Sequence, residues 1–297
     1  MASELVGGQA LVEGVMMRCG TEWAAATRRA DGTIATTRGR RGHAFAAARG
    51  IPVLRGVGAL VDSLRIGSAA MSWSRTQSAE PDSVDPTSPR RSETLVVVGV
   101  VAAVLAAFVL VPLGSAGALR GVIGTGSPAA LVEGLVRLAM FVAYLVVLSR
   151  LEGIRRTLGY HGAEHMVIAA YEDGEPPTIQ AARRHGVRHP RCGTDFFLLI
   201  FVISIVAFAL VGRLPALWLV ASRVAIAPLV VGVAYEVLRA AGTAHDSSLG
   251  RAFAAPGLWL QRFTTREPGD DQIEVALAAL GELGERAVDQ STNSGIF

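Results

Sequence analysis

Residues 95–113 read LVVVGVVAAVLAAFVLVPL and contain no charged side chain. At a rise of about 1.5 Å per residue, a helix of this length crosses a hydrocarbon core about 30 Å thick. Three further apolar stretches accompany it, namely Ala129–Ser149, Phe196–Val211 and Leu217–Ala241. The sequence therefore predicts an integral membrane α-helical bundle of about four transmembrane helices.

The composition points to the same class. Hydrophobic residues make up 51% of the 297 residues, charged residues make up 18%, and the mean hydropathy is +0.41. A soluble protein has roughly 25% charged residues, and this balance excludes a disordered, collagenous or coiled-coil chain. Two cysteines, Cys19 and Cys192, are too few for a disulfide framework. Residues 1–20 lack the uninterrupted apolar core of a cleavable signal peptide.

Two of the apolar stretches contain charged residues. Glu133 and Arg137 are four residues apart in the second stretch, so they can pair on one helical face. Arg223 and Glu236 lie in the fourth stretch. Such charges either reach the membrane surface separately or pair inside the bundle. Because a buried charge is costly in a membrane, they can also mark a functional site.

Arginine supplies all 28 basic residues, and its distribution orients the bundle. Residues 1–93 contain 12 arginines, residues 150–194 contain seven and residues 239–297 contain five, whereas the two opposite connections contain only Arg120 and Arg213. The positive-inside rule places the regions rich in arginine in the cytoplasm. We therefore expect a multi-pass protein of the plasma (inner) membrane with both termini cytoplasmic.

The predicted layout has four parts and is α+β overall. These are an N-terminal cytoplasmic β-rich region plus amphipathic helix (1–76), a flexible linker (77–93), a four-span membrane region (94–241) with a central cytoplasmic His/Cys loop at 150–194, and a C-terminal cytoplasmic helical segment (242–297).

Local patterns support this layout outside the membrane. The Gly-rich N-terminal region contains Asp31-Gly32, which fits a type I′ turn between two strands. Apolar residues at helical spacing over Ile51–Ser72 predict the amphipathic helix. Serine, proline and acidic residues dominate the linker. Asp270 or Asp271 can serve as the N-cap of a helix from about 272 to 287.

The central loop contains the candidate metal-binding and catalytic residues. Four of the six histidines lie between residues 161 and 189. His161 and His165 are four residues apart, so on a helix their imidazoles project from one face and can chelate one ion. Glu164 could act as a general base toward water activated by that ion. This H-x-x-E-H pattern is that of the inverted zincins, and it predicts a Zn²⁺ site with Glu164 as catalytic residue.

A zinc site needs more ligands than two histidines. The candidates are Cys192, His189 and Glu236, of which the first two have the short spacing common in metal sites. Glu236 lies near the cytoplasmic end of the fourth span, and the topology brings all these residues to one layer at the membrane surface. We expect at least three donor atoms within about 2.0–2.3 Å of a common point when zinc is bound.

Other interpretations of these residues remain open. The two histidines could bond to backbone carbonyls or headgroups. Cys192 could be a plain buried thiol, or a reactive one, because Gly193-Thr194 begins the third span and Thr194 is a good N-cap. Four arginines of the loop could bind a phosphate of a lipid headgroup or a nucleotide; they are Arg183, Arg184, Arg188 and Arg191. No glycine-rich loop of the Walker type accompanies them.

The sequence resembles the YqhQ-like family of bacterial membrane proteins, a family of unknown function also described as predicted metal-dependent enzymes. The resemblance covers nearly the whole chain. It rests on the segments Gly7–Arg18, Tyr160–His165, His189–Thr194, Gly232–Glu236 and Leu260–Pro268. The family's lysine after the second histidine is Met166 here, which indicates that this position is not needed for chemistry. The resemblance implies a bacterial membrane protein but no particular reaction.

Two functions of different classes fit these observations. The first is a metal-dependent (zinc) hydrolase at the cytoplasmic membrane face. The alternative is a non-enzymatic membrane protein, either an oligomeric transporter or channel lined by the four intramembrane charges or a scaffold for a cytoplasmic partner. We expect the lipid bilayer and anionic headgroups as partners and a homo-oligomer, because four spans are few for a transporter monomer. No nucleic-acid partner is expected, because no aromatic stacking platform accompanies the arginines.

Overall fold

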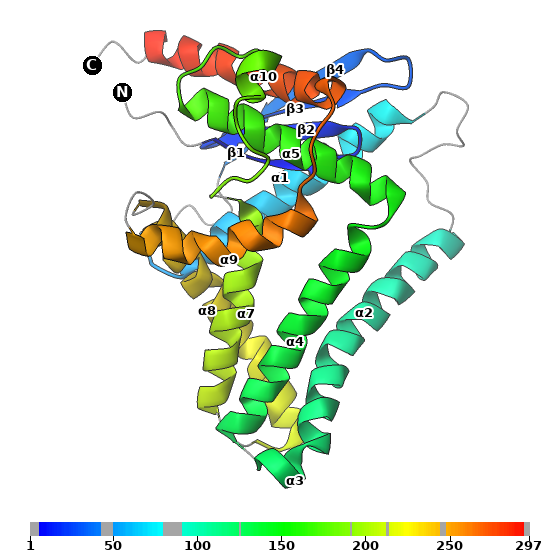
Figure 1. Cartoon of the computed structure of the whole chain (residues 1–297), viewed down its shortest axis with the longest axis vertical. Helices are drawn as coiled ribbons and strands as arrows, with labels where there is room; N and C mark the ends of the chain where they lie inside the picture. Colours follow the sequence, from blue (N-terminus) through cyan, green and yellow to red (C-terminus); the bar gives the residue numbers. More distant parts are fainter. Residues whose placement is uncertain are drawn as a thin grey trace.

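The computed structural model describes residues 6–42, 50–79, 91–124, 126–190, 192–211, 214–243 and 248–293. A sheet covered by helices occupies one end of the molecule, and four long helices run away from it toward the other end (Figure 1). The described chain is thus mainly helical with one N-terminal antiparallel sheet.

The sheet forms the predicted β-rich region. Its strands are β1 (Val6–Leu11), β2 (Gly14–Cys19), β3 (Glu22–Arg28) and β4 (Ile34–Arg40). They pair antiparallel in the order β1-β2-β3-β4, so β1 is an edge strand of this sheet. Successive side chains of a strand point to opposite faces. Helix α10 (Asp270–Asn293) packs on the face that contains Met17, and helix α1 (Leu54–Ser78) packs on the face that contains Met16.

The turn between β3 and β4 differs from the prediction. Residues 29–33 connect the strands, and Gly32 has a φ of 86°, but Asp31 does not have a positive φ. A type I′ turn requires a positive φ at both central residues, so that prediction is wrong. Asp31 instead accepts hydrogen bonds from the backbone N–H of Thr33 at 2.9 Å and from its hydroxyl at 2.6 Å. The side chain of Asp31 thereby fixes the turn, in which Gly32 but not Asp31 has a positive φ.

Helix boundaries also differ from those expected. Helix α1 extends to Ser78 and helix α2 (Arg91–Ala118) begins at Arg91, so both ends of the predicted linker 77–93 are helical. Residues 80–90 of that linker lie outside the described residues. Helix α10 starts at Asp270 itself, and the N–H of the preceding Gly269 donates to Gln272 Oε1 at 3.2 Å. The start of α10 is therefore fixed by a glutamine of its first turn rather than by an aspartate cap.

Four apolar helices make up the other end of the molecule. They are α2, α4 (Ser127–Leu148), α7 (Gly193–Val211) and α8 (Ala216–Thr243), and they pack in that order. Within the described residues, three segments are long and apolar enough to cross a membrane; they are Val98–Ala118, Pro128–Leu148 and Val220–Ala240. The third predicted span, Phe196–Val211, forms an apolar helix that is shorter than these. Three of the four predicted spans thus have the required length.

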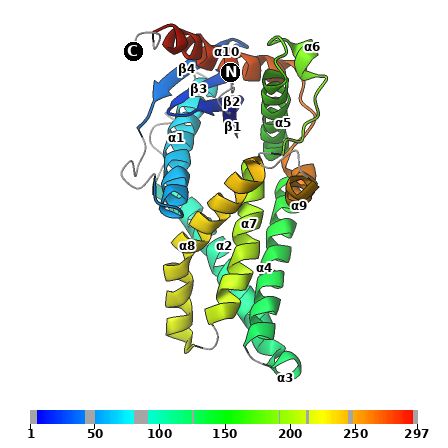
Figure 2. The same ribbon diagram turned by 90° about the vertical axis from the view of Figure 1, so that its left-hand side faces the viewer.

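Four further helices lie at the two ends and at the junction between them (Figure 1). They are α3 (Arg120–Ile123), α5 (Glu152–Glu172), α6 (Ile179–Ala182) and α9 (Ser248–Thr264). Helix α5 follows α4 after a sharp bend and runs beside the sheet, whereas α9 lies across the junction (Figure 1). Helix α1 descends from the sheet to α8 (Figure 2), where a Cβ on Gly56 would lie 2.6 Å from the Cβ of Tyr235. The absence of a side chain at Gly56 therefore permits this close approach.

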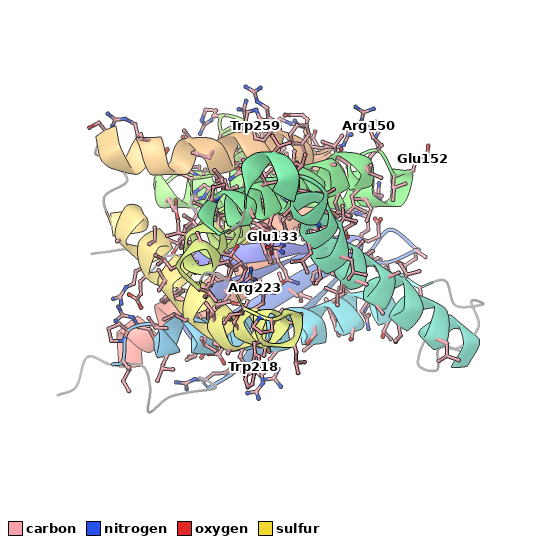
Figure 3. The ribbon with its side chains drawn as sticks, turned by 90° about the horizontal axis from the view of Figure 1, so that it is seen from below. Glu133, Arg150, Glu152, Trp218, Arg223 and Trp259 are labelled. Atoms are coloured by element: carbon pink, nitrogen blue, oxygen red, sulfur yellow. The ribbon has the colours of Figure 1, made fainter. Side chains whose placement is uncertain are left out.

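Three of the four charged residues in the apolar stretches meet inside the bundle. Glu133 is 5% exposed and accepts from Arg137 Nη2 at 2.8 Å and from Arg223 Nη2 at 3.3 Å. The Arg223 guanidinium lies over the ring of Phe208 at 4.3 Å, and Arg137 Nε donates to a carbonyl of α2 at 3.2 Å. Figure 3 shows Glu133 and Arg223 among the helices. The cluster therefore connects α2, α4, α7 and α8.

We predict that Glu133→Gln destabilises the bundle, because Arg137 and Arg223 then lose their shared counter-charge in a buried position. Breaking a buried ion pair by removing one partner costs roughly 3–5 kcal/mol. The thermal unfolding midpoint of the detergent-purified protein should fall clearly. Glu152→Gln, which changes an exposed residue of α5, is the matched control. Equal midpoints for the two variants would show that the cluster does not stabilise the bundle.

Candidate metal centre

Helix α5 positions the two histidines of the H-x-x-E-H pattern. One face of the helix is buried in the core with the sheet and α10, through residues that include Tyr160, Ala163 and Val167. Since an α-helix has 3.6 residues per turn, His161 and His165 lie together on another face. Their ring centroids are 4.4 Å apart. The helix predicted from the spacing is therefore present, and it faces the histidines away from the core.

Cys192 completes a group of three potential metal ligands. It directly precedes α7, and its Sγ lies 3.3 Å from His161 Nε2. One donor atom from each of His161, His165 and Cys192 lies within 4.8 Å of the other two. Ligands of a tetrahedral zinc ion are separated by about 3.3–3.6 Å. Small side-chain adjustments would therefore bring the three donors to one ion.

The Nδ1 atoms of His161 and His165 are both hydrogen-bonded to backbone carbonyls. His161 Nδ1 donates to the carbonyl of Thr264 at 2.6 Å, and His165 Nδ1 donates to the carbonyl of Val187 at 2.8 Å. A carbonyl can only accept, so each Nδ1 must be protonated and each Nε2 has a free lone pair when the ring is neutral. Metal-ligating histidines are held in this way by a partner on the other nitrogen.

Burial keeps His165 in the form that can bind a metal. Burial, followed by the charge of the neighbouring His161, lowers the pKa of His165 to about 3, and the bond to Val187 opposes this change. The ring is therefore neutral near pH 7, which is the ligating form of histidine.

The first turn of α7 holds Cys192 in place. The backbone N–H of Thr194 donates to Cys192 Sγ at 3.4 Å, and the Thr194 hydroxyl lies 3.2 Å from the same sulfur. The sulfur thus occupies the position of an N-cap acceptor. The expected cap was Thr194, but it lies within the helix and contributes its N–H instead. A sulfur at a helix N-terminus is favoured as thiolate, which is the form that binds metals.

Glu164 lies beside this group but is not part of it. It is 4% exposed, and its Oε2 has no hydrogen-bond partner among the described residues. Burial raises the pKa of the Glu164 carboxyl to about 7, and His161 opposes this rise. A Cβ on Gly8 would lie 2.8 Å from Glu164 Oε1, so the edge strand β1 closes over the carboxyl. The uncommitted buried oxygen fits a proton acceptor in a closed site.

The other two predicted ligands have different partners. His189 Nε2 lies 3.1 Å from Glu172 Oε2, although the His189 ring is only 5.8 Å from that of His165. Glu236 accepts from Arg55 Nε at 2.6 Å and also from its Nη2. The structure therefore brings together His161, His165 and Cys192, whereas Glu236 forms an ion pair between α8 and α1.

Two of the four loop arginines that could bind a phosphate are paired with carboxylates. Arg183 pairs with Asp270 at 2.6 Å, and Arg184 pairs with Glu175 at 2.8 Å. Arg191 lies outside the described residues. The charges of the first two arginines are therefore compensated by carboxylates.

Comparisons with known proteins identify the family. The family described as "Protein of unknown function (DUF1385)" matches residues 51–286. The chain belongs to the DUF1385 family. It is 34% identical over 291 residues to the "Uncharacterized protein YqhQ" of Bacillus subtilis (strain 168), and the match covers 93% of this chain and 91% of that protein. No solved structure matches. The resemblance seen in the sequence is thus confirmed.

Gln261 of α9 is a supporting residue that the sequence analysis of this DUF1385 protein did not single out. Its side chain is 0% exposed. Gln261 Oε1 accepts from the N–H of His189 at 2.9 Å, and Gln261 Nε2 donates to the carbonyl of His189 at 2.9 Å. The only signal in the sequence was its place in the family segment Leu260–Pro268. These two hydrogen bonds fix the backbone of the loop between Val187, whose carbonyl accepts from His165, and Cys192.

We predict that Gln261→Leu loosens the loop and lowers stability, because two buried backbone groups of His189 lose their partners. Each such loss costs about 1–3 kcal/mol. Hydrogen exchange of residues 185–189 should become faster, and the unfolding midpoint should fall. Arg262→Ala, an exposed neighbour on the same helix, should change neither. Unaltered exchange in Gln261→Leu would contradict this role.

Proposed function

We propose that this DUF1385 protein is a multi-pass protein of the bacterial plasma membrane with its sheet-bearing end in the cytoplasm. Three observations support this proposal. Few residues of the candidate spans in α2, α4 and α8 are buried, as is expected of surfaces in lipid. Arginines concentrate at the sheet-bearing end. Trp218 at the start of α8 and Trp259 of α9 point outward, as interfacial tryptophans do (Figure 3).

Within this arrangement we propose a metal-dependent hydrolase, with zinc as the ion. The observation that carries the proposal is the convergence of His161, His165 and Cys192 with both Nδ1 atoms already bonded. Two imidazoles and a thiolate are ligands that zinc accepts, and three protein ligands leave the fourth position open, as catalytic sites require. When bound there, the ion would supply a Lewis acid that activates water and polarises the bond to be cleaved.

The chain's own residues supply the other requirements of hydrolysis. Glu164 would accept a proton from water at its uncommitted Oε2 and return it to the leaving group. The carbonyls of Thr264 and Val187 orient the two histidines, and Gly8 lets β1 close over Glu164. These contacts limit access of bulk water to the carboxyl on the side of the sheet.

The transport alternative has less support from the described residues. It requires Glu133, Arg137, Arg223 and Glu236 to line one path. Arg137 and Arg223 both bond to Glu133, whereas Glu236, which is further along α8, is bound to Arg55 of α1. We therefore interpret the three-residue cluster as a structural connection between helices.

We predict about one zinc ion per chain in the purified protein, measured by inductively coupled plasma mass spectrometry. His165→Ala and Cys192→Ser should each lower zinc affinity by more than about 100-fold, the upper value for the loss of a residue that only supports a metal ligand. Glu164→Gln should keep the metal, since the carboxyl is outside the ligand group.

His185→Ala is the matched control for metal content. His185 lies in the same region but faces Asp173 and Glu175, with the nearest carboxylate oxygen at 3.4 Å. The control should retain zinc. Metal-free wild-type protein, or equal zinc in His165→Ala and wild type, would contradict the hydrolase proposal.

We further predict the orientation of the chain. A fluorescent-protein fusion after the C-terminus should fluoresce, because that end lies in the cytoplasm. An alkaline phosphatase fused after Gly124, between α3 and α4, should be active, because that connection lies outside. A phosphatase fused after the C-terminus is the control and should be inactive. The reverse pattern would overturn the proposed topology.

A further inference from the structure

A cavity opens from the candidate metal centre toward α8. Its volume is about 700 Å³, within the roughly 300–1,000 Å³ of small-molecule sites. His161, Glu164 and Cys192 line one part of it, and α1, α8 and the strands β1 and β2 contribute the remainder. A ligand in this cavity would therefore reach the metal group and the end of a bundle helix together.

Three arginines from different elements line the same cavity, and two of them form no hydrogen-bonded ion pair among the described residues. One of these two, Arg239, still interacts electrostatically with Glu236. Arg18 of β2 donates from Nε to the carbonyl of Gly20 at 2.9 Å, and Arg239 of α8 is exposed. Arg55 is bound to Glu236. Acidic groups also line the cavity, among them Asp62. Arg18 and Arg239 nevertheless offer guanidinium N–H groups outside such ion pairs, and charge-assisted donors of this kind bind phosphate and carboxylate groups well.

The edge strand β1 contributes backbone to this wall. Gly7 and Gly8 of β1 line the cavity, and a Cβ on Gly7 would meet no atom within 4 Å. A strand at the edge of a sheet has one side without a strand partner. The backbone at Gly7 is therefore open to a bound group, whereas Gly8 lies against Glu164. The cavity thus combines guanidinium groups with an accessible backbone, a combination suited to an anion.

The remaining lining is apolar and lies next to the membrane in the proposed topology. Met16, Ile66 and Ile168 contribute apolar surface, and Tyr235 and Arg239 belong to the end of the segment Val220–Ala240. A ligand with a charged head and an apolar remainder fits this distribution better than a wholly polar ligand. The head would lie at the arginines and the apolar part would follow α8.

We propose that the cavity binds a phosphate headgroup, contributed by an anionic membrane lipid, with Arg18 and Arg239 as its guanidinium contacts. The proposal rests on the proposed membrane topology and names the substrate class of the proposed hydrolase. The same phosphate chemistry could come from a water-soluble phosphate ester, and the position beside α8 favours the lipid. Binding itself requires no metal.

The test is a titration of the detergent-purified full chain, followed by native mass spectrometry. The probes are dioleoyl phosphatidic acid, dioleoyl phosphatidylcholine with the same acyl chains, and glycerol 3-phosphate as the headgroup without chains. We expect phosphatidic acid to bind at least about tenfold more tightly than either of the other two. The titration is repeated with EDTA, which removes bound metal. Failure of the zinc proposal and failure of the lipid proposal then give different results.

The variant that tests the contacts is Arg18→Gln with Arg239→Gln. It should lose the preference for phosphatidic acid, whereas Arg239→Lys should keep part of it. Arg150→Gln is the matched control, because Arg150 is an exposed arginine at the same end of the bundle and does not line the cavity (Figure 3). Arg239→Gln alone, at an exposed position, should weaken binding even if the double variant does not fold.

Three outcomes would overturn the proposal. Equal binding of the two lipids would exclude recognition of the anionic head. Glycerol 3-phosphate binding as tightly as phosphatidic acid would assign the cavity to a soluble ester. An equal loss of affinity for phosphatidic acid in Arg150→Gln and in Arg239→Gln would indicate that anionic lipids are attracted to the whole surface and not to the cavity. Selective binding with EDTA present would support the lipid proposal even for a protein that contains no zinc.

Discussion

The candidate centre depends on the geometry of helix α5, because one face of this helix packs in the core and another carries the two histidines. Tyr160, Ala163 and Val167 bury one face against the sheet and α10. The helical repeat then fixes the direction of His161 and His165, which have no freedom to turn without disturbing that core. Gly162 lies against the carbonyl of Arg266, where no Cβ would fit. Packing thus holds the ligand face of the helix toward α7 and α9.

The third potential ligand comes from a different part of the molecule, and this joins the two ends of the fold. Cys192 stands at the first turn of the apolar helix α7, whereas the histidines belong to a helix that packs on the sheet. The last residue of α9, Thr264, supplies the carbonyl that orients His161, and Gln261 of the same helix fixes the loop before Cys192. An ion at this position would therefore connect the bundle and the sheet layer directly.

Charged residues in the apolar helices have two different roles. Glu133 is shared by Arg137 and Arg223 inside the bundle, so its burial is compensated by direct hydrogen bonds. Glu236 lies near the cavity and holds Arg55 of α1. Because that pair joins α8 to α1, it positions one wall of the cavity beside the candidate centre. The charge at residue 236 therefore acts on the site through an arginine and not as a member of the ligand group.

The sequence by itself determined the features that depend on local periodicity. Uninterrupted apolar runs predicted the long helices, the i, i+4 spacing placed His161 and His165 on one face, and the family segments identified DUF1385. Other features needed the tertiary structure, because they depend on contacts between residues far apart in the chain. The sequence could not choose among Cys192, His189 and Glu236, since all three were expected in one layer. The partners of His189 and Glu236, which are Glu172 and Arg55, became evident only when α5, α8 and α1 were placed together.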